Sequence, residues 1–132
     1  MTATTAQTIN RMSLRNILFA NATFSLISGA VLIAASGPLG DFLETSRWVP
    51  IAVGLALLPW AVFAFMNGRR EQPLRRDTWL TIAGDLAWVV GAAVIILLPD
   101  SLSAGGKWAL GIVSVGVLDF AVFQWLALRR GW

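Results

Sequence analysis

Four long apolar runs constrain this chain more than any other feature. Short segments that hold the turn formers and most of the charges separate them. A helix rises about 1.5 Å per residue, so about 20 apolar residues cross the hydrocarbon core of a bilayer. The sequence therefore predicts an all-α membrane protein, a four-transmembrane-helix bundle that forms a single integral membrane domain over residues 1–132. The apolar runs are Ile17–Ser36, Trp48–Met66, Trp79–Leu98 and Trp108–Leu128.

The amino-acid composition excludes several classes of function. Charged residues make up 13% of the chain, about half the share found in soluble domains. The chain has no cysteine and no histidine, which removes thiolate chemistry, the commonest general base and the commonest metal ligand. We therefore expect no enzymatic activity, no metal and no cofactor. The net charge of +3 lies beside apolar runs, so we expect the lipid bilayer, and not nucleic acid, as the partner.

The basic residues predict the orientation in the membrane, because cytoplasmic loops are enriched in Lys and Arg. Only Arg47 and Lys107 lie on one side of the four runs. We therefore predict a multi-pass protein of the bacterial inner membrane with both termini in the cytoplasm. The arginines of the other side also suit contact with lipid headgroups. They are Arg11, Arg15, Arg69, Arg70, Arg75, Arg76, Arg129 and Arg130.

The chain contains an internal similarity. The second apolar run aligns with the fourth at an offset of 60 residues, and the first aligns less well with the third at an offset of 62. We therefore predict two tandem helical hairpins, residues 14–70 and 77–130, related by an axis along the membrane normal. The alignment of the second and fourth runs places Trp48 on Trp108, Ala61-Val62-Phe63 on Ala121-Val122-Phe123, and Arg69-Arg70 on Arg129-Arg130.

Two acidic residues, Asp85 and Asp119, lie inside apolar runs. A carboxylate at that depth costs several kcal/mol unless it is paired, hydrated or neutral. Each lies about 12–15 Å along its helix from the nearest cytoplasmic arginine. The first run adds polar residues at similar depth, and three of them, Asn21, Ser25 and Ser28, lie on one helix face at i, i+4 and i+7. We therefore predict an intramembrane polar layer formed by Asp85, Asp119, Asn21, Thr23, Ser25 and Ser28.

Three interpretations of this layer remain open. It can fix which helices pack together, or it can bind a proton or a small solute. An aspartyl hydrolase is the third, but the sequence Ile82-Ala83-Gly84-Asp85 lacks the first glycine of the Gly-x-Gly-Asp motif of intramembrane aspartyl proteases. Ala83, Ala87 and Gly91 recur every four residues and predict a helix-packing ridge, which would put the third helix at the centre of the bundle or at an oligomer seam.

Two segments resemble parts of uncharacterised four-span bacterial integral membrane proteins of similar length, a resemblance that covers nearly the whole chain and implies no activity. We therefore expect a small non-enzymatic inner-membrane protein, a helix-packing, accessory or oligomeric subunit with a second copy or another membrane protein as partner. The alternative is a proton-coupled small-solute transporter that uses Asp85 and Asp119. The two segments are Asn21-Ala22-Thr23-Phe24-Ser25-Leu26-Ile27-Ser28-Gly29 and Asp85-Leu86-Ala87-Trp88-Val89-Val90-Gly91.

Overall fold

The structure, a computed structural model, describes residues 5–131, and their side chains except at positions 6–12, 130 and 131. The described residues form five helices, and four of these are long and apolar enough to cross a membrane. The predicted all-α bundle of four apolar helices is confirmed. The helices are α1 (Thr5–Ala34), α2 (Ser36–Leu43), α3 (Trp48–Arg69), α4 (Arg75–Leu97) and α5 (Ala104–Gly131).

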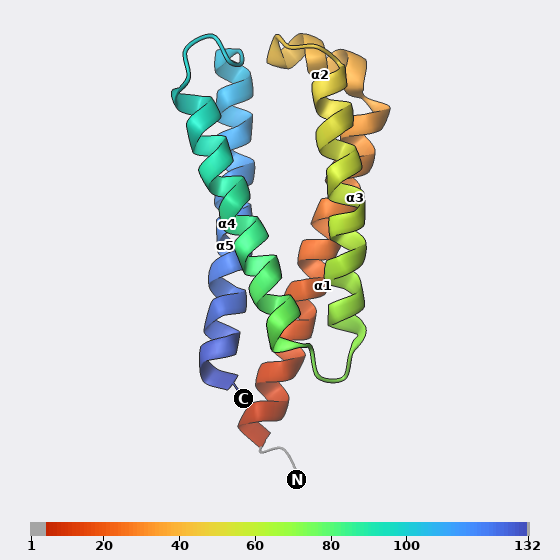
Figure 1. Cartoon of the computed structure of the whole chain (residues 1–132), viewed down its shortest axis with the longest axis vertical. Helices are drawn as coiled ribbons and strands as arrows, with labels where there is room; N and C mark the ends of the chain where they lie inside the picture. Colours follow the sequence, from red (N-terminus) through yellow and green to blue (C-terminus); the bar gives the residue numbers. More distant parts are fainter. Residues whose placement is uncertain (1–4, 132) are drawn as a thin grey trace.

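The four long helices form two hairpins in tandem, α1 with α3 and α4 with α5 (Figure 1). The hairpins pack together through α1 and α5 near the end that holds both termini, and they diverge toward the end that holds α2 (Figure 1). Helices α3 and α4 contact each other far less than α1 and α5 do. The central helices are therefore α1 and α5, and the expectation that the third apolar run lies at the centre was wrong. The unequal α1–α5 and α3–α4 contacts show that the two hairpins are not related by a strict twofold axis. They do not test whether the hairpins share an origin, so the internal duplication stays a prediction.

The segment after α1 is helical, although its turn formers favoured a loop. Helix α2 ends where Glu44 adopts a left-handed backbone conformation, with φ 57°. Two carbonyl groups at its end then have no partner within the helix, as at any helix C-terminus. Ser103, just before α5, supplies both donors: its N–H donates to Leu43 O at 3.0 Å and its Oγ donates to Phe42 O at 2.7 Å. These bonds tie the two hairpins together at the end where the long helices diverge.

Close packing of α1 on α3 depends on two glycines. A Cβ atom on Gly54 would lie 2.7 Å from the carbonyl oxygen of Gly29, and a Cβ atom on Gly29 would lie 3.1 Å from that of Gly54. Only glycine lets the two backbones approach this closely. The predicted ridge of α4 does not pack in this way, because Ala83, Ala87 and Gly91 are all exposed. The ridge was wrong as a packing face within the chain, and its alternative, an oligomer seam, stays a prediction.

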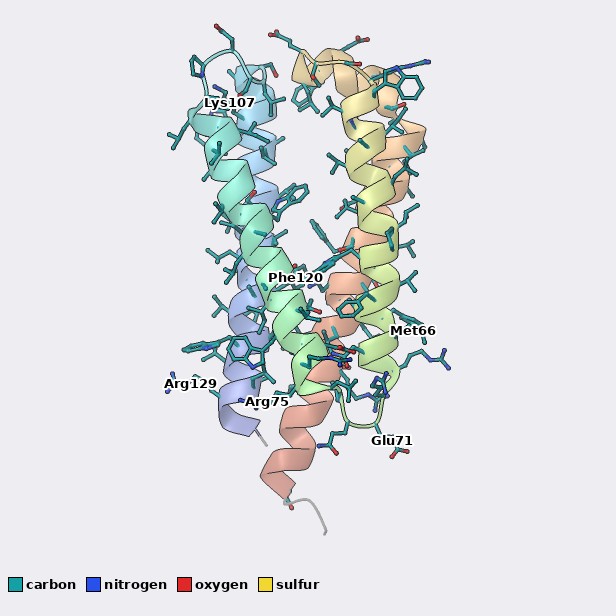
Figure 2. All side chains as sticks on the ribbon, viewed as in Figure 1. Met66, Glu71, Arg75, Lys107, Phe120 and Arg129 are labelled. Atoms are coloured by element: carbon teal, nitrogen blue, oxygen red, sulfur yellow. The ribbon has the colours of Figure 1, made fainter. Side chains whose placement is uncertain are left out.

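The basic residues gather at one end of the bundle. Figure 2 shows Arg75 and Arg129 at the end that holds the termini and Lys107 at the opposite end. The Arg129 guanidinium lies 4.8 Å from the centre of the Trp125 ring, a cation–π contact. Arg75 donates to a backbone carbonyl of α5, and Arg69, Arg70 and Arg76 are exposed. The side chain of Arg130 lies outside the described residues.

Candidate functional site

Three buried polar side chains from three helices meet in the half of the bundle near the termini. Nδ2 of Asn21 on α1 and Nε2 of Gln124 on α5 each donate to Oδ2 of Asp85 on α4, both at 3.0 Å. Asn21 is 2% exposed, Asp85 4% and Gln124 0%. Ser25, one turn further along α1, donates from Oγ to Asn21 Oδ1 at 3.4 Å. These four residues, called the Asp85 cluster below, connect the first hairpin to the second.

Helical periodicity brings these residues together. Thr78, Thr81 and Asp85 lie at i, i+3 and i+7 on α4 and are all buried, which is the spacing of one helix face. Gln124 shares the buried face of α5 with Ala121 and Leu128. Asp85 is therefore part of a buried polar face of α4, whereas Gln124 is the polar member of an otherwise apolar face of α5.

Aromatic side chains cover the cluster. A Cβ atom on Gly84 would overlap the ring of Trp60, so the absence of a side chain next to Asp85 makes room for an indole from α3. About one helical turn from Asn21 and Gln124, the rings of Phe24 and Phe120 pack with their centres 5.8 Å apart.

One atom of the cluster lacks a partner. Nε2 of Gln124 donates to Asp85 Oδ2 and also to the carbonyl oxygen of Phe120, at 2.8 Å. Both are acceptors, so this contact set requires the amide nitrogen at that position and fixes the orientation of the amide. Oε1 of Gln124 is then buried with no hydrogen-bond partner among the described residues. A buried acceptor left unpaired costs about 1–3 kcal/mol, so this oxygen is a place where a water or another small donor would bind favourably.

The structure brings together only part of the predicted polar layer. Asn21, Ser25 and Asp85 belong to the cluster, Ser28 is half-buried with no role in it, and Thr23 and Asp119 are exposed. The prediction for Asp119 was wrong because depth alone does not decide which way a helical side chain points. Asp119 precedes Gln124 by five residues, which places it about 140° round α5 at 100° per residue. Thr23 is likewise about 160° from Asn21 round α1.

Sequence reasoning missed Gln124. The residue was visible as the one amide within the last apolar run, and Ala121, Gln124 and Leu128 lie at i, i+3 and i+7, the spacing of one helix face. Asp119 was predicted to belong to the polar layer because its side chain is charged. An amide with two donor hydrogens is the better partner for a buried carboxyl.

A second polar cluster joins α3 to α4 at the same end of the bundle. Asn67 donates from Nδ2 to Thr78 Oγ1 at 3.0 Å and accepts from the Leu74 N–H at 2.8 Å. The Thr78 hydroxyl in turn donates to Leu74 O at 2.9 Å. Asn67 and Thr78 are buried, and both make these bonds within one turn of the connecting loop. This cluster closes the α3–α4 loop and has a structural role.

The chemistry available to the Asp85 cluster is limited. It contains one carboxyl group, whereas aspartyl hydrolysis uses two that share a proton. Among the described residues no group of three or more His, Cys, Asp or Glu side chains lies close enough to hold a metal ion. The cluster can therefore join helices, exchange a proton, or hydrogen-bond a small solute. No protein-family model, curated protein or solved structure matches the chain.

Proposed function

We propose that this chain is a small non-enzymatic subunit of the bacterial inner membrane, with both termini in the cytoplasm, in which the Asp85 cluster holds the two hairpins together. One observation carries the proposal: a single carboxyl oxygen accepts hydrogen bonds from α1 of the first hairpin and α5 of the second. Interhelical hydrogen bonds in membranes contribute about 0.6 kcal/mol each on average. The cluster therefore determines which helices pair more than it adds to total stability.

Two substitutions of Asp85 test this function. Asp85→Asn keeps an acceptor oxygen between Asn21 and Gln124, so its thermal unfolding in mild detergent should stay within a few degrees of the wild type. Asp85→Leu leaves two buried amide donors unpaired, each worth about 1–3 kcal/mol, and should unfold at a clearly lower temperature. Asp41→Leu, which changes an exposed acid of α2, serves as the control. Equal stability of Asp85→Leu and the wild type would refute the proposal.

A specific observation favours a second candidate, a proton-coupled transporter of a small solute. The unpartnered Oε1 of Gln124 lies on the side chain that donates to Asp85. A carboxyl that changes protonation beside a free acceptor is the arrangement needed to couple proton and solute binding. This candidate now depends on Asp85 alone, because Asp119 lies on an exposed face of α5.

Proton flux in liposomes separates the two candidates. The purified chain is reconstituted with a pH-sensitive dye inside the vesicles, and a potassium diffusion potential drives proton entry. The packing function predicts the same slow acidification with the wild type, with Asp85→Asn and with protein-free vesicles. Flux in the wild type that disappears in a stably folded Asp85→Asn would establish transport instead, because an amide carries no titratable proton.

A further inference from the structure

Asp119 lies exposed in the middle of an apolar helix. It precedes Arg129 by ten residues, about 15 Å along α5. Its neighbours Val115, Leu118 and Val122 are exposed apolar residues, so this face of α5 would meet acyl chains in a monomer. An acidic side chain that faces lipid at such depth is unfavourable, and in known membrane proteins these groups almost always face protein or water. Something must therefore cover Asp119.

The residues around Asp119 form a seam suited to another helix. Ala109, Ile112, Gly116, Asp119 and Phe123 follow one another at spacings of three, four, three and four residues, the average of 3.5 at which paired helices meet. Ile112 is 69% exposed and Phe123 54% exposed. A Cβ atom on Gly116 would meet nothing within 4 Å. This set, called the α5 seam below, lies on the side of α5 opposite Ala121 and Leu128, which pack with Ile82 of α4. Its residues are exposed or half-buried.

We propose that the α5 seam is the surface through which two copies of this chain pair in the membrane. In a pair with its twofold axis along the membrane normal, each residue on the axis meets its own counterpart at the same depth. Asp119 then faces a second carboxyl, and two carboxyl groups that meet can share one proton in a hydrogen bond. A different protein would need its own polar group at this depth, whereas a second copy has one by symmetry.

Small residues on the seam support a close pairing. Gly116 lies one turn from Asp119 and Ala109 two turns further toward the start of α5. Small residues let two membrane helices approach until their backbones are in contact, as Gly29 and Gly54 do within the chain. The inference rests on the proposed membrane-subunit function, since it takes α5 to lie in the bilayer.

Cysteine cross-linking locates the interface, and the chain has no cysteine of its own. In liposomes under mild oxidation, Ile112→Cys on the seam should form a covalent dimer. Leu118→Cys is the matched control, since it is exposed on the same helix but about 120° round from Ile112, and it should stay monomeric. Cross-linking at Leu118→Cys and not at Ile112→Cys would overturn the proposal.

Two glycine substitutions then measure the pairing without disturbing the fold. Neither Gly116→Leu nor Gly91→Leu meets an atom within 4 Å of its Cβ, so both should keep the thermal stability of the wild type. Energy transfer between labelled copies, followed as lipid is added, should show dimerisation about tenfold weaker for Gly116→Leu and unchanged for Gly91→Leu. The reverse result would place the interface on the ridge of α4. A wild type that stays monomeric would refute the pairing through α5. It would not affect the packing function proposed for the Asp85 cluster, which the unfolding of the Asp85 variants tests separately.

Discussion

At the scale of single residues, two aspartates at comparable depth have opposite surroundings. Asp85 is 4% exposed and accepts hydrogen bonds from two amides, whereas Asp119 is exposed among apolar side chains. The difference comes from helix rotation, because Asp85 lies on the face of α4 turned toward α1 and α5. Buried and exposed carboxyls in one bundle therefore suggest two tasks, internal packing for Asp85 and contact with a second copy for Asp119.

Gln124 provides a residue-scale prediction. Gln124→Leu removes one of the amide donors to Asp85 and the buried Oε1 together, so the lost hydrogen bond is partly offset by the loss of an unpaired acceptor. We expect a destabilisation of about 1–2 kcal/mol, measured by reversible unfolding in mixed detergent micelles. Gln72→Leu, an exposed amide in the α3–α4 loop, should change stability by less than about 0.5 kcal/mol. A Gln124→Leu protein more stable than the wild type would show that the packing role is wrong.

At the scale of helices, the chain uses glycine where backbones meet and polar side chains where hairpins meet. The α1–α3 hairpin is held by the approach of Gly29 to Gly54. Between the hairpins, Asn21 donates to Asp85, whose carboxyl Gln124 also holds from α5. Ser103 adds a second polar contact between the hairpins, to the end of α2. The first kind of contact needs no partner chemistry, whereas the second selects one arrangement of the four helices.

Gly54→Ala tests the glycine contact. The added methyl would lie 2.7 Å from the Gly29 carbonyl oxygen, so α1 and α3 must move apart, at a cost of about 1–3 kcal/mol. Gly91→Ala is the matched control, because its methyl meets nothing within 4 Å and alanine favours a helix over glycine by up to about 1 kcal/mol. Unfolding temperatures should therefore fall for the first variant and hold or rise for the second. Equal shifts for both would contradict the close approach.

The sequence predicted the helices better than it predicted their contacts. Hydropathy placed all four long helices, since a span needs only length and apolar composition. It missed α2, whose eight residues include Gly37, Pro38 and Gly40, because these residue types favour turns. The hydrogen bond from Ser103 that stabilises the end of α2 at Leu43 joins residues far apart in the sequence, so no local pattern shows it. Hydropathy also missed the positions of Asp119 and Gln124, since the rotation of α5 is fixed only by its packing on α1 and α4.

At the scale of the whole molecule, the two hairpins have one direction and two unlike ends. One end holds both termini and the exposed arginines Arg69, Arg70 and Arg76, and the other holds α2 and Lys107 (Figures 1 and 2). Such asymmetry orients a small membrane protein during insertion. It also means that two copies insert in the same direction, which the parallel pairing through α5 requires.

Reporter fusions test this orientation. A reporter joined after Trp132 should give a cytoplasmic signal, and one inserted between α4 and α5, at residues 99–107, should give a periplasmic signal. The physical reason is the excess of arginine on the side of the termini. Replacing Arg69, Arg70, Arg75 and Arg76 with Gln should weaken the preference and give mixed signals. A periplasmic carboxyl terminus in the unchanged chain would contradict the topology.

Charge exchange at Asp119 tests how two whole molecules meet. Two carboxyl groups can hydrogen-bond to each other through one proton, whereas the ammonium groups of two Asp119→Lys copies have only donors and repel each other. This variant alone should therefore pair more weakly than the wild type. Mixed with the wild type, it should form Asp–Lys pairs in about tenfold excess over chance, and this recovery shows that the variant is folded. Asp100→Lys changes an exposed acid of the α4–α5 loop and should pair at random with the wild type. If Asp119→Lys also mixes at random, the two Asp119 side chains do not face each other, and the seam must lie elsewhere on the bundle.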